Sequence, residues 1–97
     1  MYLEIVSPEG ALFKSTVDSV TVPGVDGEFQ MLENHAPIVS LLGKGTIKIH
    51  IHTKEHQVFD TLHSTVIPHI DDDKVLTLEI TSGTLELKDN KIIILVE

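Results

Sequence analysis

The chain has 97 residues, a formal net charge of −8, seven lysines, and neither arginine nor cysteine. A chain of this length builds one domain with a single modest core, and the lack of cysteine excludes disulfides and fits a reducing compartment. An acidic chain without arginine lacks the clustered positive charge and the bidentate side chain that nucleic-acid binding uses, so we expect no nucleic-acid partner.

The chain shows no export or membrane-spanning signal. Met1 leads directly into a mixed apolar and acidic stretch, without a basic region followed by a long apolar one. The longest uninterrupted apolar run, residues 92–96, is far shorter than the ~20 residues that a spanning helix needs. We expect a soluble protein on the cytoplasmic side.

Valine, isoleucine and threonine together make up 30 of the 97 residues. Branching at the β-carbon favours strands over helices. Turn signals recur along the chain, at residues 7–10, 23–24, 26–27, 43–45, 71–74 and 82–83. Short strands at this spacing are typical of a sandwich or barrel, and we find no linker, so the sequence predicts one domain over residues 1–97.

The segment from Val22 to Pro37 contains two glycines, two prolines and an asparagine around short apolar pairs. This composition predicts a shaped surface rather than a core strand, and shaped loops on a rigid scaffold often bind partners. The next segment, Ala36 to Leu42, has the pattern nearest to a helix, but it is short and lies between a proline and Gly43. We therefore expect no long helix.

Two later segments alternate apolar and polar residues. Ile47, Ile49 and Ile51 alternate with polar residues, and residues 76–81 repeat the pattern with leucine and isoleucine. Each predicts a strand with one buried and one wet face. Residues 84–96 predict a hairpin that turns at 88–91, and its second strand, Ile92 to Val96, has no alternation and could be covered on both faces.

Several ordered blocks of sequence resemble the amino-terminal domain of the epsilon subunit of F-type ATP synthases. The blocks are Val6-Ser7-Pro8, Leu12-Phe13, residues 17–24, Asp26-Gly27-Glu28-Phe29, Met31-Leu32, Asn34-His35-Ala36-Pro37, residues 45–49 and Ser82-Gly83. The resemblance covers most of residues 2–51 and resumes near residue 78. It implies an all-β fold, an antiparallel two-sheet β-sandwich of about ten strands.

The resemblance also implies a non-catalytic function. In this family the sandwich lies at the foot of the central stalk, bound to the gamma subunit and resting on the polar loops of the membrane c-ring. It is a non-catalytic rotor part that couples proton flow to ATP synthesis and needs no cofactor or metal. Its location would be the cytoplasmic face of the bacterial cell membrane, with membrane contact only through the complex.

By resemblance, the ring-facing turn falls on Gly24, Asp26, Gly27 and Glu28, and a second partner-binding segment on His35, Ala36 and Pro37. The exposed carboxylate of Glu28, beside Asp26, suits a basic or amide-rich partner loop. The plain alternative is that Glu28 is a solvated residue at a strand start. For His35, a ring fixed by backbone partners is favoured over a proton relay, because no carboxylate pair accompanies it. The glycines and Pro23 set the backbone shape.

Two features depart from the family pattern. The chain stops at Glu97, where longer members continue into a helical hairpin that restrains ATP hydrolysis, so we expect no inhibition of that kind. Residues 53–77 form an apparent insertion of about twenty residues where family members have a tight hairpin, with apolar residues such as Phe59 and Val66. These apolar residues indicate an ordered extra hairpin or strand pair.

The alternative function is a small cupin-like metal-dependent β-barrel enzyme. Gly45, His50, His52 and Glu55 approach the first cupin motif, but both intervals are short and the second motif is missing. The three aspartates 71–73 lack the ligand spacing of a calcium loop, so a solvated turn is favoured there. Metal content and complex formation with the gamma subunit would discriminate the two functions.

Overall fold

The structure of the chain is a computed structural model that describes residues 1–51, 59, 61–68 and 74–97. In this part of the chain the backbone forms eleven strands and no helix. They are β1 (Tyr2–Ser7), β2 (Gly10–Thr16), β3 (Ser19–Gly24), β4 (Gly27–Leu32), β5 (Ile38–Leu42), β6 (Gly45–His50), β7 (Thr61–Leu62), β8 (Ile67–Pro68), β9 (Val75–Ile80), β10 (Gly83–Lys88) and β11 (Lys91–Val96). The predicted all-β fold of about ten strands, without a long helix, is confirmed.

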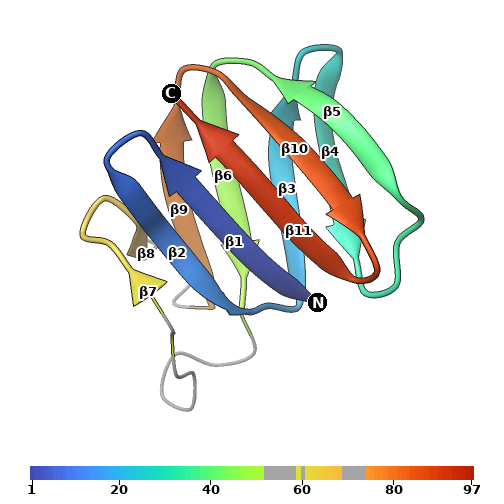
Figure 1. Cartoon of the computed structure of the whole chain (residues 1–97), viewed down its shortest axis with the longest axis horizontal. Coiled ribbons are helices and arrows are strands. Elements are labelled where there is room, and N and C mark those ends of the chain that lie inside the picture. Colours follow the sequence, from blue (N-terminus) through green and yellow to red (C-terminus); the bar gives the residue numbers. More distant parts are fainter. Residues whose placement is uncertain (52–58, 60, 69–73) are drawn as a thin grey trace.

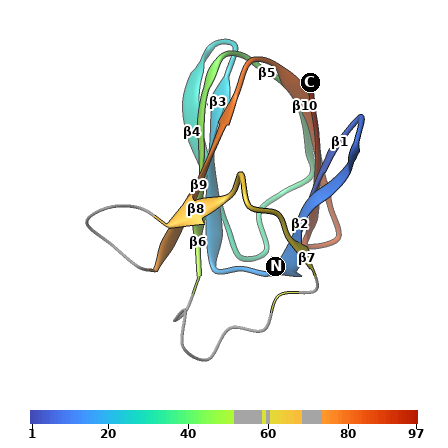
Figure 2. The same ribbon diagram turned by 90° about the vertical axis from the view of Figure 1, so that its left-hand side faces the viewer.

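The strands form one mixed sheet that curls on itself, rather than the predicted two separate antiparallel sheets. The hydrogen-bonded order is β7-β2-β1-β11-β10-β5-β3-β6-β9-β8, with β4 paired to β3 off this path. We call β2, β1, β11, β10 and β5 the front wall and β4, β3, β6 and β9 the back wall. Figure 1 looks onto the front wall, and Figure 2 shows the two walls facing each other from the side.

The walls join at one corner, and this corner explains why the sheets are not separate. Gly24 of β3 pairs with Leu42 of β5, and the Gly43 amide donates to the Pro23 carbonyl at 2.8 Å. Strand β6 begins at Gly45, so the chain passes from the front wall to the back wall within a few residues. A single stretch of backbone therefore belongs to both walls.

The sheet is mixed because β1 and β11 run parallel, with Leu3 opposite Ile92 and Ile5 opposite Ile94. All other strand pairs in the described residues are antiparallel. Parallel neighbours need a long connection, and here nearly the whole chain lies between the two strands. Local patterns therefore gave no indication of this pair.

The core lies between the walls and confirms the predicted alternation of β6 and β9. Ile47, Ile49 and Ile51 are buried, as are Leu76, Leu78 and Ile80. The other fully enclosed large side chains come from both walls: Leu3, Ile5, Phe13, Val20, Met31, Leu85, Leu87, Ile92 and Ile94. Burial of each aliphatic or aromatic side chain contributes about 1.5–3 kcal/mol to stability.

The prediction that the segment from Val22 to Pro37 is surface rather than core strand is wrong in part. The segment contains the end of β3 and all of β4, and Val22 and Met31 are fully buried. These two residues face inward. On β3 the neighbouring Thr21 is buried as well, whereas both neighbours of Met31 on β4 are exposed. The shaped surface is restricted to the turn that precedes β4 and the loop that follows it.

The predicted hairpin near residues 84–96 is confirmed as β10 and β11, with Lys88 opposite Lys91. The two turn residues, Asp89 and Asn90, have φ of 52° and 62°, as a type I′ turn requires. Coverage of β11 on both faces is wrong, because Leu95 is 52% exposed on the outer side of the front wall. No described segment covers that side (Figure 1).

The described part of the apparent insertion over 53–77 contributes to both walls and to the core. Strand β7 pairs with β2 and strand β8 pairs with β9, so the two do not form the extra hairpin with each other. Val66 is buried, and the Phe59 ring meets Phe13 edge-on with centroids 5.6 Å apart. Because β7 and β8 lie at the two ends of the sheet order, this segment bridges the side opposite the corner.

Candidate functional site

The first candidate segment is the tight turn between β3 and β4. Gly24 pairs with Gly27 across a two-residue loop of Val25 and Asp26. Gly27 has φ of 128°, a region that side chains disfavour. A Cβ on Gly24 would lie 2.8 Å from the Gly27 carbonyl oxygen and 2.9 Å from the Phe29 ring. Both glycines are therefore needed for shape, as the sequence indicates.

The charged residues of this turn point to solvent. Asp26 and Glu28 are exposed, and the Glu28 carboxylate lies 3.7 Å from Lys48 Nζ on β6. The two side chains are 54% and 40% exposed, so the pair contributes at most about 1 kcal/mol to stability. Glu28 is therefore accessible to a partner but already has one basic neighbour, which sequence reasoning missed.

The turn also borders a depression that residues of β4 and β5 line. This shallow depression of about 350 Å³ is lined by Gly24, Val25, Asp26, Gly27, Glu28, Phe29 and Ser40. It joins the turn to β5 of the front wall. A partner loop that reached the two carboxylates would also meet the Val25 side chain, which is 59% exposed.

The second candidate segment is the loop from β4 to β5. Asn34 has φ of 61°, and the His35 amide donates to the Leu32 carbonyl at 3.1 Å. The His35 Nδ1 lies 2.7 Å from the Ala36 carbonyl oxygen, and because a carbonyl only accepts, Nδ1 carries the proton of this hydrogen bond. The ring is thus fixed by the backbone, which agrees with the favoured interpretation of His35.

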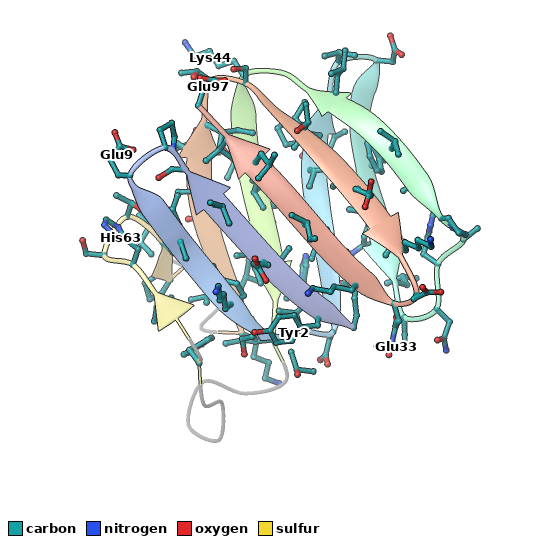
Figure 3. The ribbon with its side chains drawn as sticks, viewed as in Figure 1. Tyr2, Glu9, Glu33, Lys44, His63 and Glu97 are labelled. Atoms are coloured by element: carbon teal, nitrogen blue, oxygen red, sulfur yellow. The ribbon has the colours of Figure 1, made fainter. Side chains whose placement is uncertain are left out.

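The structure does not bring the two candidate segments together. The turn precedes β4 and the loop follows it, so the length of this six-residue strand, about 17 Å, separates them. Figure 3 shows the same separation: Glu33 of the loop lies at the opposite end of the molecule from Lys44, which is in the corner that contacts the turn. The two segments therefore lie at different places on the surface of the molecule.

A polar network that sequence reasoning missed holds the loop in place. Glu33 accepts hydrogen bonds from the Met1 ammonium group at 2.9 Å and from Asn90 Nδ2 at 2.6 Å. Asn90 Oδ1 accepts from the Asn34 amide at 3.0 Å, and its carbonyl from the Tyr2 amide at 3.0 Å. The hydrogen bond from Asn90 and the bond and charge of the ammonium group lower the pKa of Glu33 below its ordinary value of 4.5.

The metal alternative gains no support from the described residues. Residues 1–51, 59, 61–68 and 74–97 contain no group of three histidine, aspartate or glutamate side chains placed to hold a metal. His63 accepts a hydrogen bond from the Thr65 amide at 3.1 Å through Nδ1. His52, Glu55 and the aspartates 71–73 lie outside the described residues, so the cupin-like set is not tested by the structure.

The sequence matches the family model "ATP synthase, Delta/Epsilon chain, beta-sandwich domain" over residues 1–62. The chain belongs to this family. It is 35% identical to the ATP synthase epsilon chain of Leptospira interrogans over 95 residues, which cover 98% of this chain and 59% of the relative. It is 48% identical to the epsilon chain of Campylobacter concisus over 58 residues, which cover 60% of this chain and 45% of the relative.

The fold also matches that of a chain in a solved structure. A chain in the central stalk/c-ring structure of the Tetrahymena thermophila mitochondrial ATP synthase superposes with a TM-score of 0.67 at 14% identity. The match covers 99% of this chain and 62% of that chain. At this identity the likeness concerns the fold alone. The delta/epsilon chain described here thus spans about half to two thirds of the lengths of the relatives that it matches.

The family match includes both candidate segments, since residues 24–28 and 35–37 lie within residues 1–62. It also includes the network residues Met1 and Glu33, whereas Asn90 lies outside it. In the described residues of this delta/epsilon chain, no helix has the length and apolar character needed to cross a membrane.

Proposed function

We propose that the chain is a non-catalytic rotor subunit of an F-type ATP synthase, located at the foot of the central stalk. It would connect the gamma subunit to the c-ring and transmit the rotation that couples proton flow to ATP synthesis. The observation that carries this proposal is the family match over residues 1–62, extended by 35% identity to an epsilon chain over 95 residues. The location would be the cytoplasmic face of the bacterial cell membrane.

The rigidity of the curled sheet supports a role in force transmission. Protein interiors packed from both walls have low compressibility and pass on an applied displacement. The hydrogen bonds at the corner tie the β3–β4 turn to the front wall, with the Val25 amide donating to the Leu41 carbonyl at 3.1 Å. A load on the turn would therefore reach the whole sheet without the motion of a hinge.

We assign the ring contact to the turn residues Gly24, Asp26, Gly27 and Glu28. Two exposed carboxylates on a tight turn suit a basic or amide-rich loop, and the glycines allow close approach. His35, Ala36 and Pro37 form a second contact segment, on a different surface because β4 separates it from the turn. The backbone bonds of His35 suit a fixed contact rather than proton transfer.

The proposal is tested first by mixing. The purified chain, prepared without a histidine tag, is combined with the gamma subunit of the same organism and separated by size exclusion, and its metal content is measured. We expect a metal-free one-to-one complex. A stoichiometric metal and no complex would instead support the cupin-like enzyme.

The ring contact is tested by crosslinking, which the absence of cysteine in the chain makes simple. A cysteine at Glu28 and, as a control, one at Ile67 are each introduced into the assembled complex with a cysteine in the c-ring loop. Ile67 is 55% exposed on β8, which pairs with β9 at the opposite edge of the back wall from β4. We expect product from position 28 only, and equal yields from both positions would remove the assignment.

A further inference from the structure

Strand β4 is the free edge of the back wall. It pairs with β3 on one side, and no other strand of the described residues pairs with it. Figure 1 shows β4 at the margin of the back wall, with no strand of that wall beyond it. An edge strand presents a row of unpaired amide and carbonyl groups, and such a row is a template for pairing with another strand.

The pairing of β3 determines which groups of β4 point outward. Gly24 and Gly27 flank the two-residue loop and form the first hydrogen-bonded pair of the hairpin. The carbonyl of the next residue on β3, Pro23, bonds away from β4, across the corner. Hydrogen-bonded and outward residues alternate along an antiparallel pair. The outward residues of β4 are therefore Glu28, Gln30 and Leu32.

Most groups of this outward row have no partner within the described part of the chain. The outward amides and carbonyls of Glu28 and Gln30 bond to none of the described residues. The Leu32 carbonyl accepts from the His35 amide at 3.1 Å, and a carbonyl oxygen has a second lone pair for another donor. The row is therefore available to a further strand.

The two ends of the sheet order are blocked, whereas β4 is not. Strands β7 and β8 have two residues each, and β8 contains Pro68. Very short edge strands and proline are common means of preventing edge-to-edge pairing. Strand β4 has six residues without proline or lysine, and its register with β3 is unbroken.

Two copies of β4 are complementary in an antiparallel arrangement. If the Gln30 residues of both copies lie opposite each other on a two-fold axis, Glu28 of each copy is opposite Leu32 of the other. All of these are outward residues, so each pair exchanges two hydrogen bonds. A shift by two residues in either direction leaves one outward residue of each copy beyond the end of the other strand. The register centred on Gln30 therefore forms the most hydrogen bonds.

The side chains also suit this register. On the outer face Glu28 is opposite Leu32, which is 58% exposed in the single chain, and the two Gln30 amides are able to donate to each other. On the core face Phe29 is opposite Met31, an apolar pair. No like charges are opposite each other, and such cross-strand pairs stabilise a sheet. This self-complementarity favours a second copy as the occupant.

We propose that β4 is a self-association edge, through which two copies of the chain join their back walls into one continuous sheet. The contact is isologous, with its two-fold axis through the Gln30 pair. Because its area is that of one six-residue strand, the dimer is weak and reversible rather than obligate. The proposal concerns the chain by itself and does not rest on the proposed function.

The test is sedimentation equilibrium of the full chain from micromolar to millimolar concentration. The salt concentration is about 0.15 M, so that the repulsion between two acidic copies is screened beyond about 8 Å. We expect an equilibrium between monomer and dimer. Gln30→Lys and Gln30→Glu each place like charges opposite each other on the axis, and each should weaken the dimer by about tenfold or more. A mixture of the two variants pairs opposite charges there and should recover association.

Thr84→Lys and Thr84→Glu are the matched controls. Thr84 is exposed on β10 of the front wall, and these substitutions make the same changes in net charge away from the edge. Both controls should leave the dissociation constant of the dimer unchanged. Thermal unfolding should be unchanged in all four variants, because both positions are exposed.

Several outcomes would overturn the proposal. One is a chain that stays monomeric up to millimolar concentration. Another is a dimer that the Gln30 variants leave intact, since its contact would then lie elsewhere on the molecule. Loss of association that the mixture does not recover would exclude the two-fold axis at Gln30. Equal effects of the Thr84 and Gln30 variants would assign the change to net charge rather than to the edge.

Discussion

Asn90 donates a 2.6 Å hydrogen bond from Nδ2 to Glu33 Oε1 and so joins two turns that are 57 residues apart in the sequence. Glu33 also accepts a hydrogen bond from the Met1 ammonium group, and Asn90 Oδ1 accepts one from the Asn34 amide. The loop that carries His35 is therefore anchored to the β10–β11 turn. Its shape therefore depends on the β10–β11 turn as well as on its own residues.

The first prediction concerns pH. The pKa of Glu33 is lowered in the folded protein, chiefly by the hydrogen bond from Asn90, so the folded state favours the charged carboxylate. This contribution to stability is present above the unfolded pKa, ordinarily 4.5, and is lost as pH falls through the lower folded pKa. Glu33→Gln should unfold at lower urea than the unaltered chain at pH 7, and the difference should shrink below pH 4.5.

The measurement is the urea midpoint at several pH values, with Glu86→Gln as the control. Glu86 is exposed on the front wall, and the substitution makes the same chemical change outside the network. A constant difference between Glu33→Gln and the unaltered chain down to the lowest pH would show that the carboxylate is not linked to folding in this way.

The corner between the walls gives the second prediction. A Cβ on Gly45 would lie 2.7 Å from Pro23 Cβ, whereas a Cβ on Gly43 would meet its nearest atom at 3.9 Å. Gly45→Ala should destabilise the protein by about 1–3 kcal/mol, because the packed corner has to shift. Gly43→Ala should be nearly neutral. Equal changes in the free energy of unfolding for the two variants would contradict this account of the corner.

How far the fold could be predicted from sequence depended on the range of the interaction. Ile47, Ile49 and Ile51 revealed their buried face through alternation, and Lys88 to Lys91 revealed its turn through composition, since both signals are local. The parallel pairing of β1 with β11 and the bond from Asn90 to Glu33 join distant segments, and no local pattern encodes them. The prediction that Ile92 to Val96 is covered on both faces was wrong because an apolar strand has the same composition whether its outer face is exposed or covered.

How far the candidate site could be predicted from sequence also depended on the range of the interactions. The family pattern located the β3–β4 turn and the His35 loop, and the turn's glycines indicated its shape. Their separation by the length of β4 became clear only when Val22 and Met31 proved to be core residues of strands. The ion pair between Glu28 and Lys48 also depends on strand order, because β3 lies between the strands that carry them.

The third prediction concerns the segment that departs from the family pattern. Val66 is 4% exposed within the core and its neighbour Ile67 is 55% exposed. Val66→Ala should destabilise the protein by about 1–3 kcal/mol through lost burial and the cavity left behind. Ile67→Ala should change the free energy of unfolding by no more than about 0.5 kcal/mol. A neutral Val66→Ala would mean that this segment does not stabilise the core.

The last prediction separates the two roles of Asn90, which are to occupy a turn position with positive φ and to donate to Glu33. Asn90→Gly keeps the turn, since glycine adopts φ of 62° without strain, but removes the side-chain bonds. Asn90→Asp keeps the acceptor for Asn34 but places a carboxylate where the amide donated to Glu33, and two adjacent carboxylates raise the pKa of one of them.

At pH 7 we expect thermal stability to decrease from the unaltered chain to Asn90→Gly and then to Asn90→Asp. Near pH 3 one carboxyl of the pair is protonated and can donate again, so Asn90→Asp should become at least as stable as Asn90→Gly. An order of the two variants that does not change between these pH values would show that the bond to Glu33 is incidental to the turn.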